Sequence, residues 1–208
     1  MSSSSQYVPA KVWQAPTESG GQFSNINRPA SGATHEKVLP AGKHPFQLHS
    51  LATPNGVKVS IMLEELKEAG IELPEIEIKT INLAKGEQFT ELFTQHNLNQ
   101  KIPVLIDGER SIMESCAILQ YLAEKYPTPM LPAGEARWDI LPWVYWQAAN
   151  VGPNFGNKLS YTRYMDDVPT AQKQHPLERF NKQALRLMAV LAKQHGNNPL
   201  ICGTTFSI

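Results

Sequence analysis

The sequence predicts an α/β domain followed by an all-α region. Between about residues 46 and 125, short alternating segments and helical periodicities follow one another in the order β-α-β-α-β-β-α. After three closely spaced prolines, Pro127, Pro129 and Pro132, apolar residues recur only at helical spacing. A chain of 208 residues with 41% hydrophobic residues can bury the cores of two small domains.

The first half of the α/β domain is predicted to be strand, helix and strand. Phe46 and Leu48 alternate with polar residues as in a short strand. In the following turn, residues 53–56, we expect Asn55 to cap a helix. That helix carries one apolar face and stops at Gly70, and Ile76 and Ile78 then alternate with charged residues as a second strand. The apolar face consists of Val59, Met62, Leu63 and Leu66.

The second half is predicted to be a helix, a hairpin and a helix. A helical stretch with Phe89, Leu92, Phe93 and His96 leads to Pro103, which opens the third strand. Asp107-Gly108 is a strong turn signal between residues 104–106 and 111–113. The helix that begins at Ser115 has one face formed by Ile118, Tyr121, Leu122 and Lys125.

Two segments of this domain predict a site for a small acidic peptide. If the Ile102-Pro103 bond is cis, the backbone of Ile102 offers its N–H and C=O to an extended ligand. Glu114 and Ser115 stand where a strand gives way to a helix, whose first N–H groups favour a carboxylate. A glutathione-like ligand carries both a peptide backbone and a carboxylate. Two simpler interpretations stay open: Pro103 merely breaks a strand, and Ser115 merely caps a helix.

Thr53 is the candidate donor to a thiolate. A free thiol has a pKa of about 8.5, and a hydroxyl or a helix N-terminal amide beside it lowers that value. The two cysteines, Cys116 and Cys202, lie far apart without CxxC spacing, which argues against a disulfide framework and a dithiol motif. We therefore expect the reactive thiol to belong to a bound ligand rather than to the chain. We interpret Cys116 as a small buried packing residue rather than a nucleophile.

Charge and hydropathy exclude several other functions. Lys+Arg and Asp+Glu number 19 each, so no global positive field holds a phosphate backbone, and nucleic acid is an unexpected partner. No apolar stretch approaches the roughly 20 residues that span a bilayer, and residues 1–6 lack the features of a signal peptide. We expect a cytoplasmic protein without a membrane partner or a metal.

The first 45 residues and the helical region remain to be interpreted. Residues 1–45 lack periodicity but contain Trp13, Phe23, Asn25 and Asn27, so we expect an arm that lies against the folded body or a partner subunit; a disordered leader is the alternative. In the helical region we expect two buried helix faces, formed by Trp138, Leu141, Val144 and Tyr145 and by Phe180, Ala184, Leu187, Met188 and Leu191. The cluster Trp143, Tyr145 and Trp146 lines an apolar pocket or, more simply, packs in the core.

Several segments resemble one protein family. "KIPVL" and "ESCAILQYLAEKYP" resemble the N-terminal, thioredoxin-like domain of glutathione transferases (GSTs). The segment from "FSNINRPASG" to "SIMLEEL" is similar to the Nu-class, or YghU-type, disulfide-bond oxidoreductases and their fungal Ure2-like relatives. The resemblance implies an arm (1–45), a thioredoxin-like glutathione-binding domain (46–127) and an all-α GST domain (133–208). Since the sequence stops at "TTFSI", where these proteins begin a further helix, we expect this helical domain to be truncated.

The resemblance also implies an activity and a set of site residues. It implies glutathione-dependent reduction of disulfides, with glutathione as bound co-substrate, no metal and a homodimer. Conjugation of glutathione to electrophiles, or a non-catalytic binding or regulatory role, is the alternative. Thr53 and Asn55 would be catalytic. The glutathione contacts would be Asn27, Thr53, Pro54, Asn55, Gln88, Lys101, Ile102, Glu114, Ser115, Gln147 and Arg179.

Overall fold

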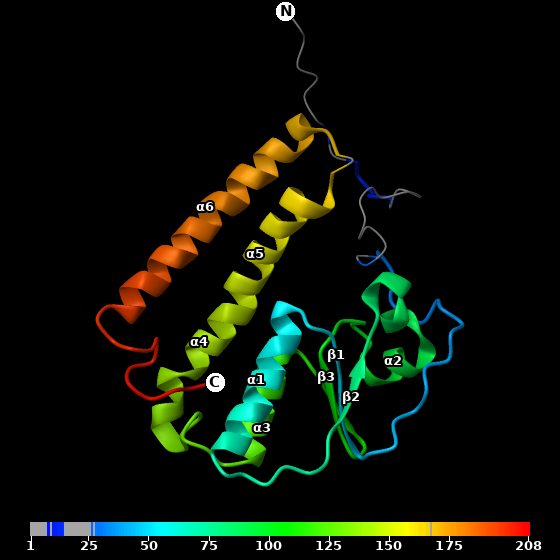
Figure 1. Ribbon diagram of the computed structural model, residues 1–208. Coiled ribbons are helices and arrows are strands. Elements are labelled where there is room, and N and C mark those ends of the chain that lie inside the picture. Colours follow the sequence, from blue (N-terminus) through cyan, green and yellow to red (C-terminus); the bar gives the residue numbers. More distant parts are fainter. Residues whose placement is uncertain (1–7, 9, 15–25, 27, 167) are drawn as a thin grey trace, which may run out of the picture.

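A four-stranded sheet with helices on both faces forms the first half of the molecule, and long helices form the second (Figure 1). The computed structural model describes residues 8, 10–14, 26, 28–166 and 168–208. The α/β half contains β1 (Phe46–Ser50), α1 (Pro54–Glu68), β2 (Glu77–Thr80), η2 (Leu83–Lys85), η3 (Glu87–Phe89), α2 (Glu91–His96), β3 (Val104–Asp107), β4 (Arg110–Met113) and α3 (Ser115–Lys125). The predicted order of strands and helices is confirmed.

The sheet has the strand order β2-β1-β3-β4. β1 runs parallel to β2, with Ser50 opposite Thr80, and antiparallel to β3, with His49 opposite Val104. The β3–β4 hairpin pairs Asp107 with Arg110, and Gly108 in its turn has φ +60°, a conformation that glycine adopts without strain. The hairpin that Asp107-Gly108 predicts is therefore confirmed.

Helices α1 and α3 cover one face of the sheet (Figure 1). The predicted apolar face of α1 is buried, and Gly70, with φ +78°, follows the helix end. In α3, Ile118 and Leu122 are fully buried against the same cluster, which includes Leu48 and Leu105 of the sheet. Burying each such side chain contributes roughly 1.5–3 kcal/mol, so this layer is the main stabilising core.

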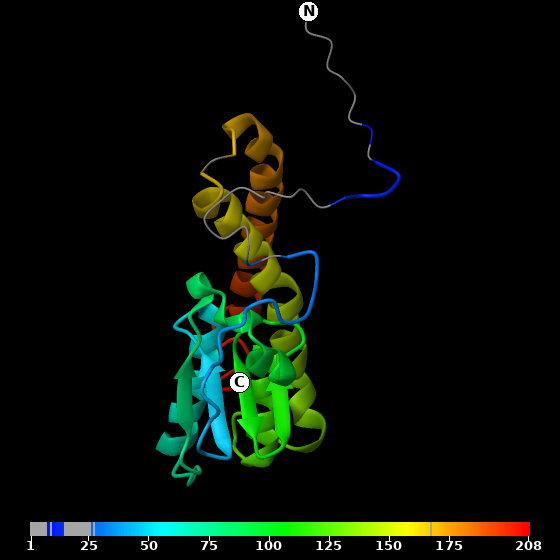
Figure 2. The same cartoon turned by 90° about the vertical axis from the view of Figure 1, so that its right-hand side faces the viewer.

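The other face of the sheet is covered by α2 and by the chain that precedes β1 (Figure 2). Thr34 and His35 donate backbone hydrogen bonds to the Phe89 carbonyl, and His35 forms a β-bridge with Thr90. The prediction that the arm lies against the folded body is confirmed for its described part after residue 28. Both faces of β1 are thus covered, and all five of its residues are buried.

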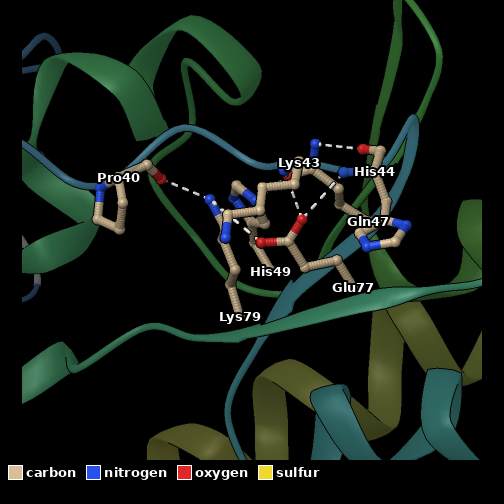
Figure 3. A network of polar contacts seen from close by, with 7 residues as sticks. All are labelled: Pro40, Lys43, His44, Gln47, His49, Glu77 and Lys79. Carbon is tan, nitrogen blue, oxygen red and sulfur yellow. Dashed lines mark hydrogen bonds and ion pairs between the residues drawn. The ribbon is translucent and has the colours of Figure 1, made fainter.

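Residues 40–44 are attached to the edge strand β2 by polar contacts (Figure 3). One carboxylate oxygen of Glu77 accepts hydrogen bonds from the backbone N–H groups of Lys43, at 2.6 Å, and His44, at 3.1 Å. These bonds hold the pKa of Glu77 below its usual value. Lys79 donates to the Pro40 carbonyl, so charged side chains of β2 fix the arm just before it enters the sheet.

The second half is a long helical run followed by one antiparallel helix (Figure 1). The turn η4 (Gly134–Asp139) leads into α4 (Leu141–Trp146), the π-helical segment η5 (Gln147–Val151), α5 (Gly152–Leu159), the π-helical segment η6 (Ser160–Tyr164) and finally α6 (Thr170–His195). α6 packs beside α5. None of the helices within the described ranges has the length and apolar character needed to cross a membrane.

The two helix faces predicted to be buried are only partly so. Leu141 and Val144 are buried, but Trp138 is 59% exposed because it lies in η4, before the helical phase of α4 begins. Tyr145 points outward, and its hydroxyl donates to Gln120. On α6, Ala184 and Leu187 are buried whereas Met188 is 53% exposed, because only a narrow stripe of this helix meets α5. The prediction was wrong for Trp138, Tyr145 and Met188.

Candidate functional site

The strand register brings three predicted site segments to one end of the sheet. β1 ends at this end and is followed by Thr53, while β3 begins there just after Ile102. Val104, the first residue of β3, also pairs with Met113, the last residue of β4, so residues 114 and 115 follow at the same end. Segments separated by about 60 residues of sequence therefore converge because antiparallel neighbours alternate in direction.

Thr53 is the N-cap of α1. Its Oγ1 accepts a hydrogen bond from the backbone N–H of Gly56 at 3.2 Å, and Pro54 occupies the first turn, where its missing N–H costs nothing. The expectation that Asn55 caps this helix is wrong, because the helix begins at Pro54 and Asn55 lies inside its first turn with its side chain exposed. Thr53 holds its cap bond as an acceptor, so its hydroxyl proton is not used by this bond.

The Ile102-Pro103 peptide bond is cis, the condition that the sequence analysis set for a peptide-binding edge. The loop before it is fixed by side chains. Gln100 has φ +56°, which is uncommon for a residue with a side chain, and its amide donates to the Gly32 carbonyl and to Thr94 Oγ1, both at 2.9 Å. Asn97 donates to the Lys101 carbonyl at 2.7 Å. This loop is therefore held from both sides before it reaches Ile102.

Arg28, in the arm that precedes β1, also contacts the loop that leads to Ile102. The Arg28 guanidinium lies 3.6 Å from the centroid of the Phe89 ring and donates to Gln100 Oε1 and to the Gly32 carbonyl. Arg28 was not among the predicted site residues. An arginine in a polar, aperiodic segment gives no sequence signal that it stacks on a residue 61 positions away.

Glu114 and Ser115 lie where β4 gives way to α3, as expected. Glu114 is the residue before the helix, with φ +70° and no side-chain cap hydrogen bond, and its carboxylate accepts from the Asn99 amide at 3.4 Å. Ser115 is the first helical residue and is buried. The backbone N–H groups of this first turn have no partner within the helix and carry the positive end of its dipole.

Lys58 of α1 is a site residue that the sequence analysis missed. Its ammonium Nζ donates to Ser115 Oγ at 3.2 Å and to Gln147 Oε1 at 2.8 Å, and lies 4.0 Å from Cys116 Sγ. Burial lowers the pKa of Lys58, although Cys116 and Glu114 act in the opposite direction. A lysine five residues after an N-cap looks like an ordinary exposed helix position, so only its contacts with α3 and with Gln147 of η5 identify it.

Lys58 also stands at the edge of a cavity of about 490 Å³. Its walls are mostly apolar and include Leu119, Trp143 and Val144. The polar and thiol groups among them include Cys116, Gln147, His195, Cys202 and Ser207. Of the predicted aromatic cluster, Trp143 lines this cavity and stacks edge-on against Trp146 at a centroid distance of 5.4 Å. Tyr145 instead faces outward.

Cys116 is buried, as expected of a small packing residue. Its Sγ lies 3.3 Å from Gln147 Oε1, to which the thiol donates, and it packs within the main core cluster. Both Cys116 and Cys202 are free thiols.

Of the other residues predicted to contact glutathione, some lie near this end of the sheet and others do not. Gln88, in η3, is buried, and neither polar atom of its amide has a hydrogen-bond partner in the described part of the chain. Burial lowers the pKa of Lys101, whose ammonium reaches the Ile26 carbonyl at 3.4 Å. Arg179 is exposed on α6, whose contacts are mainly with other helices of the second half, so the structure does not bring it to this group. Asn27 lies outside the described residues.

No cluster of three or more His, Cys, Asp or Glu side chains that could ligate a metal occurs within the described ranges. The donors at this end of the sheet are hydroxyls, amides, backbone N–H groups and the ammonium groups of Lys58 and Lys101. These donors suit an anionic, peptide-like ligand.

Comparisons with known proteins agree with this geometry. The family described as Glutathione S-transferase, N-terminal domain, matches residues 45–124. Disulfide-bond oxidoreductase YghU of Escherichia coli is 41% identical over 97% of this chain and 70% of the relative. An uncharacterized GST-like protein of Streptococcus mutans is 38% identical over 98% of this chain and 78% of the relative.

Solved structures show the same similarity. The glutathione transferase YghU from Streptococcus pneumoniae, complexed with glutathione, superposes with a TM-score of 0.87 and 36% identity, covering 97% of this chain and 77% of that one. A glutathione transferase family member from Pseudomonas fluorescens with two glutathione molecules bound gives a TM-score of 0.71 and 34% identity, covering 80% and 73%.

Proposed function

The chain belongs to the glutathione transferase superfamily, within its group of YghU-type disulfide-bond oxidoreductases, and on this premise we propose that it binds glutathione and reduces disulfides with the bound thiolate. One observation supports the proposal most directly. The register of β1, β3 and β4 places Thr53, Ile102 and Ser115 at the same end of the sheet. These positions supply a donor for a sulfur, a backbone edge for a peptide and a helix start for a carboxylate.

The proposed binding mode follows from those three groups. The cysteinyl part of glutathione pairs with the backbone of Ile102 as an added strand, beside the cis bond to Pro103. The γ-glutamyl carboxylate accepts from the first turn of α3 and from Ser115, while Glu114 faces its ammonium group. Gln88, whose buried amide has no partner in the described chain, and Lys101 are further contacts in this proposal. So are Asn27 and Gln147, whereas Arg179, which the structure does not bring to the other groups, is not assigned to this glutathione.

Thr53 activates the sulfur in this mechanism. Because Thr53 Oγ1 accepts from Gly56 in its cap bond, its proton remains able to donate to a thiolate in front of α1. A hydrogen bond to the ionised form lowers the pKa of the thiol from about 8.5 toward neutrality, as does the positive end of α1. Pro54 and Asn55 complete the sulfur's surroundings, with Asn55 exposed at the second helical position.

The reaction is thiol–disulfide exchange. The glutathione thiolate attacks one sulfur of the incoming disulfide, which forms a mixed disulfide and releases the other sulfur as a thiolate. A second glutathione thiolate then attacks the glutathione sulfur of the mixed disulfide, which yields glutathione disulfide and releases the second product thiol. In total, two glutathione molecules are oxidised to one glutathione disulfide, each losing one proton and one electron. The substrate disulfide gains these two protons and two electrons and becomes two thiols.

A paired assay tests this function against its alternatives. The protein is given glutathione together with bis(2-hydroxyethyl) disulfide in one assay and 1-chloro-2,4-dinitrobenzene in the other. We expect turnover of the disulfide to exceed that of the aryl halide. The opposite ranking would favour a conjugating transferase. Glutathione binding without either turnover would indicate a binding or regulatory protein.

Two further proposals come from the family. We expect a homodimer. Size-exclusion chromatography with light scattering tests this, because it measures the molar mass of the protein in solution. We also expect the domain division at residues 45, 127 and 133, with the second domain formed by the α4–α6 region. Limited proteolysis in the presence of glutathione, which should protect residues 46–127, tests this division.

A further inference from the structure

Lys58 joins both parts of the candidate site. Its ammonium donates to Ser115 Oγ in α3 and to Gln147 Oε1 in η5, at 3.2 and 2.8 Å. From these contacts we infer that Lys58 is a positioning residue, which orients the Ser115 hydroxyl toward the γ-glutamyl carboxylate of glutathione and thereby selects ligands that carry this carboxylate. The inference rests on the proposed function, because it concerns the same binding site.

The direction of the hydrogen bond carries the argument. An ammonium group has three N–H donors and no acceptor, so Ser115 Oγ must accept from Lys58. The Ser115 proton is then directed away from Lys58 and can donate elsewhere. A carboxylate accepts but does not donate, so a serine oriented in this way is matched to a carboxylate. Without Lys58 the hydroxyl could rotate and accept from another donor instead.

The positive charge of Lys58 also favours a carboxylate ligand at this position. Two of the three close partners of the Lys58 ammonium, the Ser115 hydroxyl and the Gln147 amide, are neutral groups, and the third is Cys116. The ion pairs formed by the described residues do not include Lys58, and Glu114 acts on it only over a longer distance. Lys58 is thus a half-buried cation that forms none of these ion pairs. Its charge favours the binding of an anion at the adjacent start of α3.

Gln147 is oriented by the same cation. Its Oε1 accepts from Lys58 and from the Cys116 thiol at 3.3 Å, so the oxygen of the amide is fully used. The amide NH₂ group therefore points away from Lys58 and Cys116. Lys58 thus fixes the donor direction of two predicted glutathione contacts, one from each half of the chain.

A purely structural role is the competing explanation, since the same contacts tie α1 to α3 and to η5. The two explanations differ in their dependence on the ligand. A structural tie affects every ligand of the site, whereas the inferred role affects only ligands that carry the γ-glutamyl carboxylate. Cysteinylglycine, which is glutathione without its γ-glutamyl residue, retains the peptide edge and the thiol and is therefore the matched probe.

The test uses Lys58→Met, which keeps the aliphatic stem and removes the ammonium. We expect its affinity for glutathione to fall about tenfold or more, the effect of losing a charge-assisted arrangement, and its affinity for cysteinylglycine to change by less than about twofold. Lys67→Met on the exposed side of α1, where Lys67 pairs with Glu64, is the control and should leave both affinities unchanged. Lys58→Arg, which keeps charge and donors, should restore most of the glutathione affinity.

A double-mutant cycle completes the test. Once Ser115 is replaced by alanine, Lys58→Met should cost much less glutathione affinity than it does in the original chain, because the two residues act as a unit. Lys58→Gln, which removes the charge and leaves the hydroxyl direction undefined, serves the same purpose if Lys58→Met does not fold. Equal weakening of both ligands, or additive effects in the cycle, would overturn the inference and leave the proposed function intact. A parent chain that binds no glutathione would overturn both.

Discussion

Arg28 and Gln100 are 72 residues apart in sequence, yet Arg28 Nη2 donates a 2.9 Å hydrogen bond to Gln100 Oε1. The same guanidinium stacks on Phe89, and Gln100 is held at φ +56° two residues before Ile102. The arm therefore supports, through Arg28, the backbone that the proposal assigns to peptide recognition.

Replacing Arg28 with Gln should destabilise the fold and weaken glutathione binding. The change removes the contact with Phe89 and the guanidinium's hydrogen bonds to Gln100, Gly32 and Thr34, together on the order of 2 kcal/mol or more in the free energy of unfolding. Urea unfolding measures the first effect and calorimetric titration the second. Arg186→Gln is the control, because Arg186 lies on the exposed side of α6 and donates to Gln183 of the same helix. Equal unfolding midpoints for the two variants would contradict this prediction.

Thr53→Ala should slow disulfide reduction by roughly tenfold or more and raise the pKa of the bound thiol, because one hydrogen bond to a thiolate is worth on the order of 1–3 kcal/mol. It also removes the N-cap bond to Gly56, at a cost of about 1 kcal/mol in stability. Thr53→Ser keeps both functions and should behave like the parent chain. Ultraviolet absorbance of the bound thiolate follows the pKa. A Thr53→Ala protein with an unchanged thiol pKa would exclude Thr53 as the donor.

Replacing Glu114 and Ser115 together with alanine should weaken glutathione binding by a few kcal/mol, since each charge-assisted hydrogen bond contributes roughly 1.5–3 kcal/mol. Calorimetry with glutathione gives the difference directly. Glu109→Ala with Ser111→Ala, at and beside the hairpin turn, is a matched pair on the same hairpin. If glutathione binds the Glu114/Ser115 variant as tightly as the parent chain, the start of α3 is not the binding site.

Changing Cys116 and Cys202 to serine should leave disulfide reduction largely intact, because the reactive sulfur is proposed to be that of glutathione. A serine hydroxyl in place of the Cys116 thiol can still donate to Gln147, so the expected cost at this buried position is a packing penalty in stability rather than a loss of rate. The assay with glutathione and bis(2-hydroxyethyl) disulfide described above measures the rate of disulfide reduction. An inactive but folded cysteine-free protein would assign the nucleophile to the chain itself.

His49 should make stability depend on pH. Burial lowers its pKa from 6.5 to about 4, with Lys79 and His96 contributing in the same direction and Glu77 in the opposite one. Its Nε2 contacts Gln47 Oε1 at 3.1 Å, and its Nδ1 has no partner in the described chain, so a proton there would be buried without an acceptor.

The sign follows from proton linkage. Between pH 6.5 and about 4 the unfolded chain binds a proton at His49 that the folded chain does not, so stability falls as pH is lowered through this window. The upper limit of this loss is about 3 kcal/mol, at about 1.36 kcal/mol per pKa unit. Urea unfolding of the parent chain and of His49→Gln at about pH 7 and about pH 4.5 isolates the contribution of His49. The two proteins should lose stability unequally, with the larger loss in the parent chain; parallel losses would contradict the assignment.

The sequence predicted the strands and helices of the α/β half because their signals are local. Alternation of apolar residues around Leu48, the Asp107-Gly108 turn and the apolar face of α1 each depend on fewer than about 15 neighbouring residues. Local signals failed where burial depended on a distant partner. Trp138 and Met188 fit a helical period but remain exposed, because the turn before α4 breaks the period and α6 has only a narrow contact with α5.

Sequence by itself, through periodicity and turn residues, determined the order of elements in the α/β half. Together with the family motifs it also predicts most residues of the candidate site, from Thr53 to Ser115. Only the tertiary structure brought Lys58 to Ser115 and Gln147, and Arg28 to Gln100. The physical reason is that a hydrogen bond between remote side chains depends on where whole helices and loops pack, which no short window of sequence encodes. Lysine and arginine show this most clearly, since their usual place is a solvated surface and only packing gives them partners within the fold.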